Sequence, residues 1–372
     1  MLRKTLLASV TVAFCSLVLF SLAPIAAAQD LTAGMGQGTP QLVTAGPLAF
    51  GPQGILFVGD TRSATIFAIA TGDATGDPNG VTMDVANLNG KVAALLGADS
   101  ASIRINDVVV NPASGQVYVS VARGRGADAT PVICRVTTNG DVEEFSLDNV
   151  KFSKASLPNA PAERQGRRNP RMESITDIAY IQEQVVIAGL SNEEFASKLR
   201  AVAFPFDDVN AGASVEIYHG AHGALETRSP VRTFAPFGID GEMHVVAAYT
   251  CTPLVTFPMA DLKPGSKVKG TTVAELGNRN RPLDMFVYEK DSKNYILMAN
   301  NARGMMKIQT DQINSMKGID SRISGGGTAG LKYETIEGMD NVVQLDRLND
   351  GHALILVQTE SGAQDLKTVV LP

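Results

Sequence analysis

The sequence predicts an all-β protein, a single β-propeller of six blades. Three observations indicate this fold. Short apolar runs bounded by Gly, Pro, Asn and Asp recur along the chain, three such runs form a unit, and the units follow one another at a spacing of about 50 to 70 residues. A β-sandwich does not need a unit of three or four strands to recur along the whole chain, so the repeat favours blades.

The first 28 residues are predicted to be a signal peptide. Arg3 and Lys4 form a basic start, residues 6–24 are almost wholly apolar, and Ala26 to Ala28 supply a small-residue cleavage pattern. The alternative is a retained membrane anchor, but the Ala-x-Ala end favours cleavage near Ala28. We therefore expect a periplasmic or secreted protein with a linker over residues 29–40 and the propeller over residues 41–372.

The charge of the chain excludes some partners. The net charge is −6, and it becomes −8 when Arg3 and Lys4 are removed. An acidic surface disfavours general nucleic-acid binding, which needs basic side chains to displace counterions from phosphates. It also disfavours docking on anionic lipid, so we expect no membrane association after cleavage. The expected partner is a small molecule or another exported protein.

Each of the six units consists of three expected strands. Most of these runs are rich in β-branched residues and are separated by turn-forming residues. The expected strands are 47–50, 55–58 and 64–69; 107–110, 117–121 and 132–136; 177–181, 185–188 and 199–204; 237–241, 244–248 and 254–257; 284–288, 295–298 and 305–308; and 342–345, 353–357 and 367–371.

The two ends of the propeller region predict how the ring closes. The last unit ends at Pro372, directly after its third strand, so it lacks a fourth. A spare apolar run, Gln41 to Ala45, precedes the first unit. We expect this N-terminal strand to complete the last blade, which would leave no open sheet edge there.

The blade pattern resembles the NHL-repeat propellers and their gluconolactonase-like and strictosidine-synthase-like relatives. The resemblance is carried best by residues 47–60, Pro-Leu-Ala-Phe-Gly-Pro-Gln-Gly-Ile-Leu-Phe-Val-Gly-Asp. It implies the propeller architecture. The gluconolactonase-like relatives also imply a divalent metal at the mouth of the central channel.

Two stretches depart from a minimal blade. Residues 84–97 have helical spacing of their apolar side chains, which predicts a short helix inserted in the first blade. Residues 151–172 are expected to form a long connection rich in arginine, which is either a functional or a disordered loop.

Carboxylates lead into four of the innermost strands. In a propeller, these positions converge on the mouth of the central channel, where carboxylates repel one another and either bind protons or bind a cation. Oxygen ligands favour Ca²⁺. The alternative is that each carboxylate caps its own turn by accepting backbone N–H groups. The candidate metal ligands are Asp107, Asp177, Asp284 and Asp340.

His219 and His222 form a second candidate metal site. A His-x-x-His pair can bind Zn²⁺ or Cu²⁺ when a third ligand is present, and Cys251 is a possible third ligand. The alternative is that both histidines bond loop carbonyl groups. Apart from Cys251, the mature chain contains only Cys134, and we expect no disulfide between them because they lie two blades apart.

Polar loops are expected on the same face as the channel mouth. We call this the top face: it carries the segments that lead into the innermost strands and the loops between the second and third strands of each blade. A ring of both charges there could bind an anionic or sugar-like ligand. The candidate ligand-binding residues are Arg62, Arg123, Asn192, Glu193, Asn301 and Arg303.

Three functional hypotheses remain open from the sequence. The first is an exported propeller that binds a small ligand or a protein partner on its top face, with a divalent metal at the channel. The second is a metal-dependent hydrolase of the lactonase or esterase type, and the third is an interaction scaffold without metal. No nucleophile elbow, phosphate-binding loop or dinucleotide-binding motif occurs in the chain, so no motif selects a reaction.

Overall fold

The computed structural model describes residues 29–166, 169–207, 209–251 and 253–372. The predicted signal peptide lies outside these residues. Within them, residues 31–372 form one compact unit, and none of the described helices is long and apolar enough to cross a membrane.

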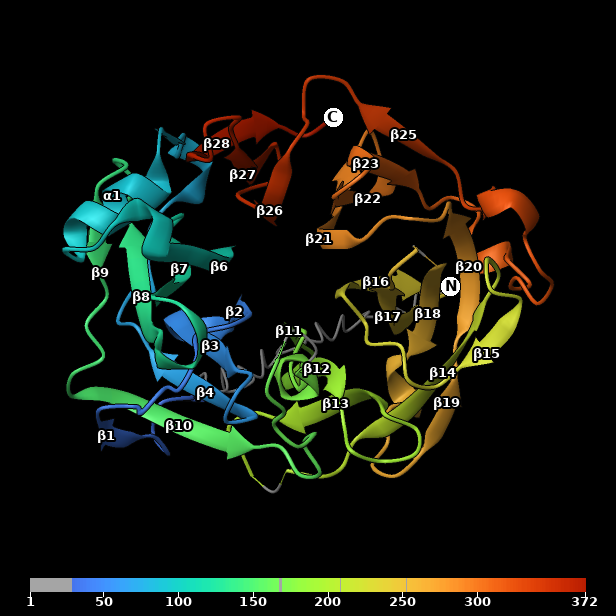
Figure 1. Cartoon of the computed structure of the whole chain (residues 1–372), viewed down its shortest axis with the longest axis horizontal. Helices are drawn as coiled ribbons and strands as arrows, with labels where there is room; N and C mark the ends of the chain where they lie inside the picture. Colours follow the sequence, from blue (N-terminus) through green and yellow to red (C-terminus); the bar gives the residue numbers. More distant parts are fainter. Residues whose placement is uncertain (1–28, 167–168, 208, 252) are drawn as a thin grey trace, which may run out of the picture. The chain divides into compact units, whose positions relative to one another are not determined.

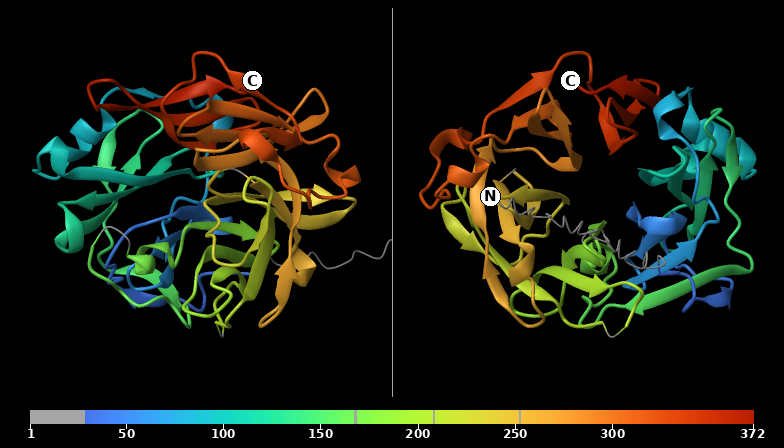
Figure 2. Two further views of the ribbon diagram at one scale, coloured as in Figure 1. Left: turned by 45° about the vertical axis from the view of Figure 1, so that its right-hand side comes forward. Right: turned by 180° about the vertical axis from the view of Figure 1, so that it is seen from behind.

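Six sheets of mostly antiparallel strands surround a central channel, as predicted (Figure 1; Figure 2 shows the ring from two further directions). Six strands line the channel: β2 (Leu48–Phe50), β6 (Ile103–Val110), β11 (Asp177–Ile181), β16 (Thr233–Ile239), β21 (Pro282–Lys290) and β26 (Val342–Arg347). The second strands are β3 (Ile55–Asp60), β7 (Val117–Arg123), β12 (Gln184–Leu190), β17 (Glu242–Ala248), β22 (Lys293–Asn300) and β27 (His352–Gln358).

The third strands also match the predicted runs. They are β4 (Thr65–Ala70), β8 (Thr130–Val136), β13 (Ser197–Ala203), β18 (Pro253–Pro258), β23 (Gly304–Gln309) and β28 (Gln364–Val370). The innermost strand of the fourth blade was misplaced by sequence, because β16 begins at Thr233 and not at Phe237. The cause is that Pro236 and Gly238 interrupt its apolar pattern.

The fourth strands were for the most part not predicted individually. They are β10 (Val150–Ser156), β9 (Val142–Glu144), β14 (Ala213–His219), β20 (Thr271–Leu276), β25 (Tyr333–Ile336) and β5 (Asp84–Val85). Four short strands extend the outer edges: β1 (Gly36–Gly38) pairs with β10, β15 (Ala224–Glu226) and β19 (Lys267–Lys269) pair with β14, and β24 (Thr328–Gly330) pairs with β20.

The ring closes differently from the prediction. An N-terminal strand does complete the last blade, but it is β5, which pairs with β28, and not residues 41–45, which form no strand. The chain also returns to the first blade to add β10 beside β4, so residues 151–156 are not part of a long loop. Around the ring, the innermost strands therefore follow the order β2, β6, β26, β21, β16 and β11 (Figure 1).

Two smaller expectations concern the first blade. The predicted helix exists as α1 (Leu88–Leu95), but it follows β5 and contacts β6, β9 and β28 rather than the first blade. The range 29–40, expected to be a linker, contains β1.

Apolar layers between neighbouring blades form the core. On β3, Ile55 and Phe57 pack toward the blade of β11, whereas Leu56 and Val58 pack toward the blade of β6. Successive side chains of a strand point to opposite faces, so a strand buried on both faces is apolar at every position. This explains why the second strands of the blades are mostly continuous apolar runs in the sequence.

Both cysteines are free, as predicted. Cys134 is buried in β8 of the second blade, and Cys251 lies in the loop after β17 of the fourth. These two blades are not neighbours in the ring. The stability of the protein therefore depends on the packed blades and not on a disulfide.

Candidate functional site

A large groove opens on the top face of the propeller. It has a volume of about 1670 Å³ and is walled by the segments that lead into β2, β6 and β11 and by the loops after β3 and β7. It shares Pro47, Asn106, Thr176 and Arg232 with the lining of the central channel, so the groove lies over the channel mouth. The volume exceeds the roughly 300 to 1,000 Å³ typical of a pocket for one small ligand.

The groove is basic although the protein is acidic. Among the described residues that line it, there are six arginines and two glutamates, with no lysine or aspartate. The arginines are Arg62, Arg104, Arg125, Arg164, Arg232 and Arg281. No described aromatic side chain lines the groove, so it offers no ring surface on which a neutral sugar or a base could stack.

Only two of these arginines are paired with a carboxylate. Arg62 Nε lies 2.8 Å from Glu163 Oε1, and Arg232 Nη1 lies 2.8 Å from Glu173 Oε1. The other four form no ion pair with a described residue of the chain. The groove therefore carries a local excess of four positive charges.

Three of the arginines influence one another. Loss of hydration lowers the pKa of Arg281, and the positive charges of Arg232 and Arg104 lower it further, against the attraction of Glu173. Like charges that are held together by a rigid scaffold favour a bound anion, because the anion removes their repulsion.

Asp60 holds one wall of the groove in place. Its fully buried carboxylate accepts hydrogen bonds from the backbone N–H groups of Val43 (2.7 Å), Thr44 (3.0 Å) and Ser63 (3.1 Å) and from the Thr44 hydroxyl (2.7 Å). Because Val43 and Thr44 line the groove, Asp60 at the end of β3 is a positioning residue for this face.

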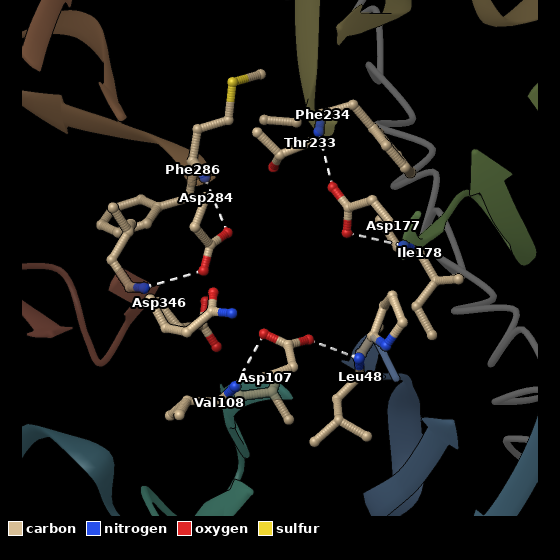
Figure 3. A pocket seen from close by; sticks show the side chains of 18 of the residues that line it. Leu48, Asp107, Val108, Asp177, Ile178, Thr233, Phe234, Asp284, Phe286 and Asp346 are labelled. Carbon is tan, nitrogen blue, oxygen red and sulfur yellow. Dashed lines mark hydrogen bonds between the residues drawn. The ribbon is translucent and has the colours of Figure 1, made fainter. Parts of the chain in front are cut away.

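Beneath the groove, four aspartates line the channel, which has a volume of about 360 Å³. Each carboxylate joins two neighbouring blades. Asp107 accepts the N–H groups of Val108 on its own strand (2.8 Å) and of Leu48 on β2 (2.7 Å), and Asp177 accepts those of Ile178 (2.8 Å) and of Phe234 on β16 (2.8 Å) (Figure 3).

The other two aspartates repeat this arrangement. Asp284 accepts the N–H groups of Met285 (2.9 Å) and of Leu345 on β26 (2.9 Å). Asp346 accepts those of Arg347 and of Val110 on β6, both at 2.7 Å. All four carboxylates therefore bond the neighbour on the same side of the ring, and four of the six blade junctions are bridged in this way.

The aspartate prediction is corrected at one position. Asp340 is exposed in the connection between β25 and β26, and Asp346 points into the channel instead. The strand start was placed correctly, but Gln344 occupies the position after the bulge that Asp107 and Asp284 occupy in β6 and β21, and Asp346 lies two residues farther along β26. Asp346 also lies deeper than Asp107, since it bonds Val110, three residues farther along β6.

The channel carboxylates do not form a cluster that could chelate an ion. Among the described residues, the one group of three or more His, Cys, Asp or Glu side chains whose ligand atoms lie within 4.8 Å of one another is His219, His222 and Glu226. The alternative expectation, that each aspartate accepts backbone N–H groups, describes the observed hydrogen bonds of the channel aspartates. It differs in one respect: one oxygen accepts an N–H of its own strand, whereas the other accepts an N–H of the next blade.

Burial raises the pKa values of these aspartates. The pKa rises to about 7 for Asp177 and to about 6 for Asp346, and it rises well above the usual value for Asp107 and Asp284, where repulsion from neighbouring carboxylates adds to burial. The channel therefore carries less negative charge near neutral pH than four ionised carboxylates would.

This shift predicts how stability depends on pH. A carboxyl group whose pKa is raised on folding binds its proton more tightly in the folded protein than in the unfolded chain. For Asp177, the resulting contribution to the free energy of unfolding is therefore complete below the usual pKa of 3.8 and is lost as the pH rises through about 7. We expect a higher melting temperature at about pH 5 than at about pH 8. Asp177→Asn should reduce this difference, because an amide does not titrate. Calorimetry across this range tests the expectation, and a melting temperature that rises steadily with pH would contradict it.

Of the predicted ligand-binding residues, the structure places only Arg62 in the groove. The Arg123 guanidinium donates to the Leu96 carbonyl, outside the groove lining. Glu193 pairs with Lys198 and accepts a hydrogen bond from Asn159, and Asn192 is exposed beside it.

Asn301 and Arg303 hold loops of the fifth blade. Asn301 Oδ1 accepts the N–H of Arg281 (2.6 Å), so Asn301 supports a groove residue without lining the groove. Arg303 donates to the Asn278 carbonyl (2.9 Å). Two groove residues that were not predicted, Arg104 and Arg281, share a feature of the sequence. Arg104 lies three positions before Asp107, and Arg281 lies three positions before Asp284, so each precedes a channel aspartate by the same spacing.

The predicted histidine pair lies on the top side of β14, away from the groove. The rings of His219 and His222 are 3.9 Å apart between centroids. Cys251 does not join them, since its N–H bonds the Asn280 carbonyl and its thiol is outside the cluster. The third member is Glu226, which the sequence analysis did not identify.

The fold defines the protein as a six-bladed β-propeller. Among solved structures, the chain is similar to a proposed oxidoreductase (glucose dehydrogenase) from Thermus thermophilus, at 12% identity over 90% of this chain and 99% of that chain, with a TM-score of 0.37. It is also similar to the PQQ-bound aldose sugar dehydrogenase of Streptomyces coelicolor, at 13% identity over 90% and 97%, with a TM-score of 0.34. A third similar structure is the extracellular region of plexin A4, at 9% identity over 89% and 47%, with a TM-score of 0.40.

No protein-family model matches the sequence, and no curated protein matches it. The function must therefore be argued from the residues of the groove, the channel and the outer rim.

Proposed function

We propose that this propeller binds an anionic ligand in the arginine groove of its top face. The observation that carries the proposal is the group of arginines with no carboxylate partner among the described residues, Arg104, Arg125, Arg164 and Arg281, at the mouth of the channel of an acidic protein. A guanidinium group offers paired N–H donors that match carboxylate, sulfate and phosphate oxygens. In keeping with the predicted signal peptide, the ligand would be met outside the cytoplasm.

The size and lining of the groove narrow the ligand class. A volume of about 1670 Å³ suits an extended molecule with several anionic groups better than a single small anion. The absence of aromatic side chains among the described lining residues disfavours neutral sugars. We therefore expect a polyanion, such as a sulfated or carboxylated oligosaccharide or a polyphosphate.

The hydrolase hypothesis receives less support. A lactonase-type reaction in the channel would need several carboxylates to hold one metal ion, which would then polarise a carbonyl group. In Asp107, Asp177 and Asp284, one oxygen instead accepts a backbone N–H of the same strand and the other accepts one from an adjacent blade. The resemblance to gluconolactonase-like propellers therefore does not extend to a chelating arrangement of these side chains.

Titration calorimetry with three probes tests the proposal. The probes are a heparin-derived tetrasaccharide, inorganic tripolyphosphate and maltotetraose, which is neutral. We expect the two anions to bind one per chain at low salt and to bind more weakly as salt screens the charges, while maltotetraose does not bind. Tighter binding of the tetrasaccharide would indicate an acidic sugar, and tighter binding of tripolyphosphate would indicate a phosphate ligand. Equal binding of the neutral sugar, or no binding of either anion, would refute the proposal.

A further inference from the structure

A cluster of two histidines and two glutamates lies on the outer rim of the third and fourth blades. His219 ends β14, residues 220–223 form a turn, and Glu226 ends β15, which pairs with β14. In this register Ile217 faces Glu226, so Glu226 and His219 project from the same side of the hairpin. The turn brings His222 back over His219, since the N–H groups of both His222 and Gly223 donate to the His219 carbonyl.

One carboxylate oxygen meets both imidazoles. Glu226 Oε1 lies 3.0 Å from His219 Nδ1 and 2.5 Å from His222 Nδ1. The second oxygen, Oε2, accepts the Ser229 hydroxyl, which fixes the carboxylate orientation. A tetrahedral metal ion with bonds of about 2.0 to 2.2 Å holds its ligand atoms about 3.3 Å apart, so the contacts of Glu226 Oε1 with the two imidazole nitrogens would each lengthen by less than about 1 Å around such an ion.

The buried side of the cluster contains polar atoms that need a partner. His219 is 2% exposed, and its Nε2 has no hydrogen-bond partner among the residues that the structure describes. Glu275 of β20 is 0% exposed and uses Oε1 to accept the N–H of Gly220, while its Oε2 has no partner among those same residues. Leaving buried polar atoms unpaired is costly, and these two atoms are complementary, because Nε2 of the imidazole can donate the hydrogen bond that Oε2 of Glu275 can accept.

We propose that His219, His222 and Glu226 bind one divalent transition-metal ion, with Glu275 as the outer carboxylate that orients His219. Two imidazole nitrogens and one carboxylate oxygen suit Zn²⁺ or Cu²⁺, whereas Ca²⁺ prefers oxygen ligands alone. A metal-bound histidine usually donates its other N–H to a carboxylate, which is the role that the free oxygen of Glu275 would serve for His219. The His222 side chain is 56% exposed, so the ion would keep an open side toward solvent.

Metal titrations of the mature protein, after treatment with a chelator, test this site. We expect one Zn²⁺ or Cu²⁺ per chain, a higher melting temperature with either ion, and no effect of Ca²⁺ at the same concentration. Co²⁺ should give visible absorption bands typical of tetrahedral coordination. Weaker than millimolar binding of both Zn²⁺ and Cu²⁺ would overturn the proposal, and would leave the cluster as a hydrogen-bonded network.

Three variants separate ligands from neighbours. His222→Ala is expected to weaken Zn²⁺ binding at least 100-fold, and because His222 is exposed, the metal-free variant should melt like the parent. Glu275→Gln should weaken binding about 10- to 100-fold while keeping one ion per chain, as is usual for outer carboxylates. The matched control is His244→Ala, since His244 is outside the cluster and faces the Glu242 carbonyl. Equal affinity in His222→Ala and the parent would overturn the proposal.

Discussion

Replacing Asp60 with alanine is expected to lower the free energy of unfolding by about 3–5 kcal/mol, because it removes the buried, charged acceptor of four hydrogen bonds, and water replaces that acceptor only in part for the exposed and half-buried donors. The lost acceptor serves three backbone N–H groups and one hydroxyl. Asp60→Asn keeps one acceptor oxygen, so its loss should be smaller. Urea unfolding at constant pH measures both variants.

A matched control is available in Asp77. This exposed aspartate accepts a single backbone N–H, from Asn79, so Asp77→Ala should cost no more than about 1 kcal/mol. If Asp60→Ala unfolds with the same midpoint as Asp77→Ala, the buried carboxylate does not hold the groove wall.

Removing Arg104 and Arg281 together is expected to weaken binding of the heparin-derived tetrasaccharide at least 100-fold. Each charged hydrogen bond to the ligand is worth about 1.5–3 kcal/mol, and a loss of about 2.8 kcal/mol corresponds to a factor of 100. Neither arginine is paired with a described carboxylate, so the double alanine variant leaves no orphaned partner. Its stability should equal or slightly exceed that of the parent, because repulsion within the groove is relieved.

Arg123→Ala is the control for charge alone. It removes the same side chain from the end of β7, next to groove residues Ala122 and Gly124, but from a position outside the groove lining. We expect its affinity to stay within about twofold of the parent. Equal losses in Arg123→Ala and in the double variant would show that net charge, and not the groove, determines binding.

The sequence predicted the fold well where strands are buried on both faces. Runs such as Ile55 to Val58 are apolar at every position, because both sides of the strand contact neighbouring blades. The closing strand was misassigned because β5 has only two residues, Asp84 and Val85, which is too short for any periodicity. Likewise β10 is mostly polar, and its return to the first blade depends on long-range pairing that no local pattern encodes.

The candidate sites were predicted in part. Asp107, Asp177 and Asp284 do converge on the channel, but the sequence could not show that one oxygen of each accepts a backbone N–H from an adjacent blade. Glu226 was missed because it joins the histidines only through the pairing of β15 with β14.

The groove was missed for a similar reason. Its arginines come from five blades, and they are brought together by the ring order of the blades, which differs from their order in the chain.

A crystal structure of the mature protein with the heparin-derived tetrasaccharide tests the central claim most directly. The account predicts sulfate or carboxylate groups within hydrogen-bonding distance of Arg104 and Arg281, over the channel mouth. A tetrasaccharide bound elsewhere on the propeller, with the groove arginines in contact only with solvent, would contradict it.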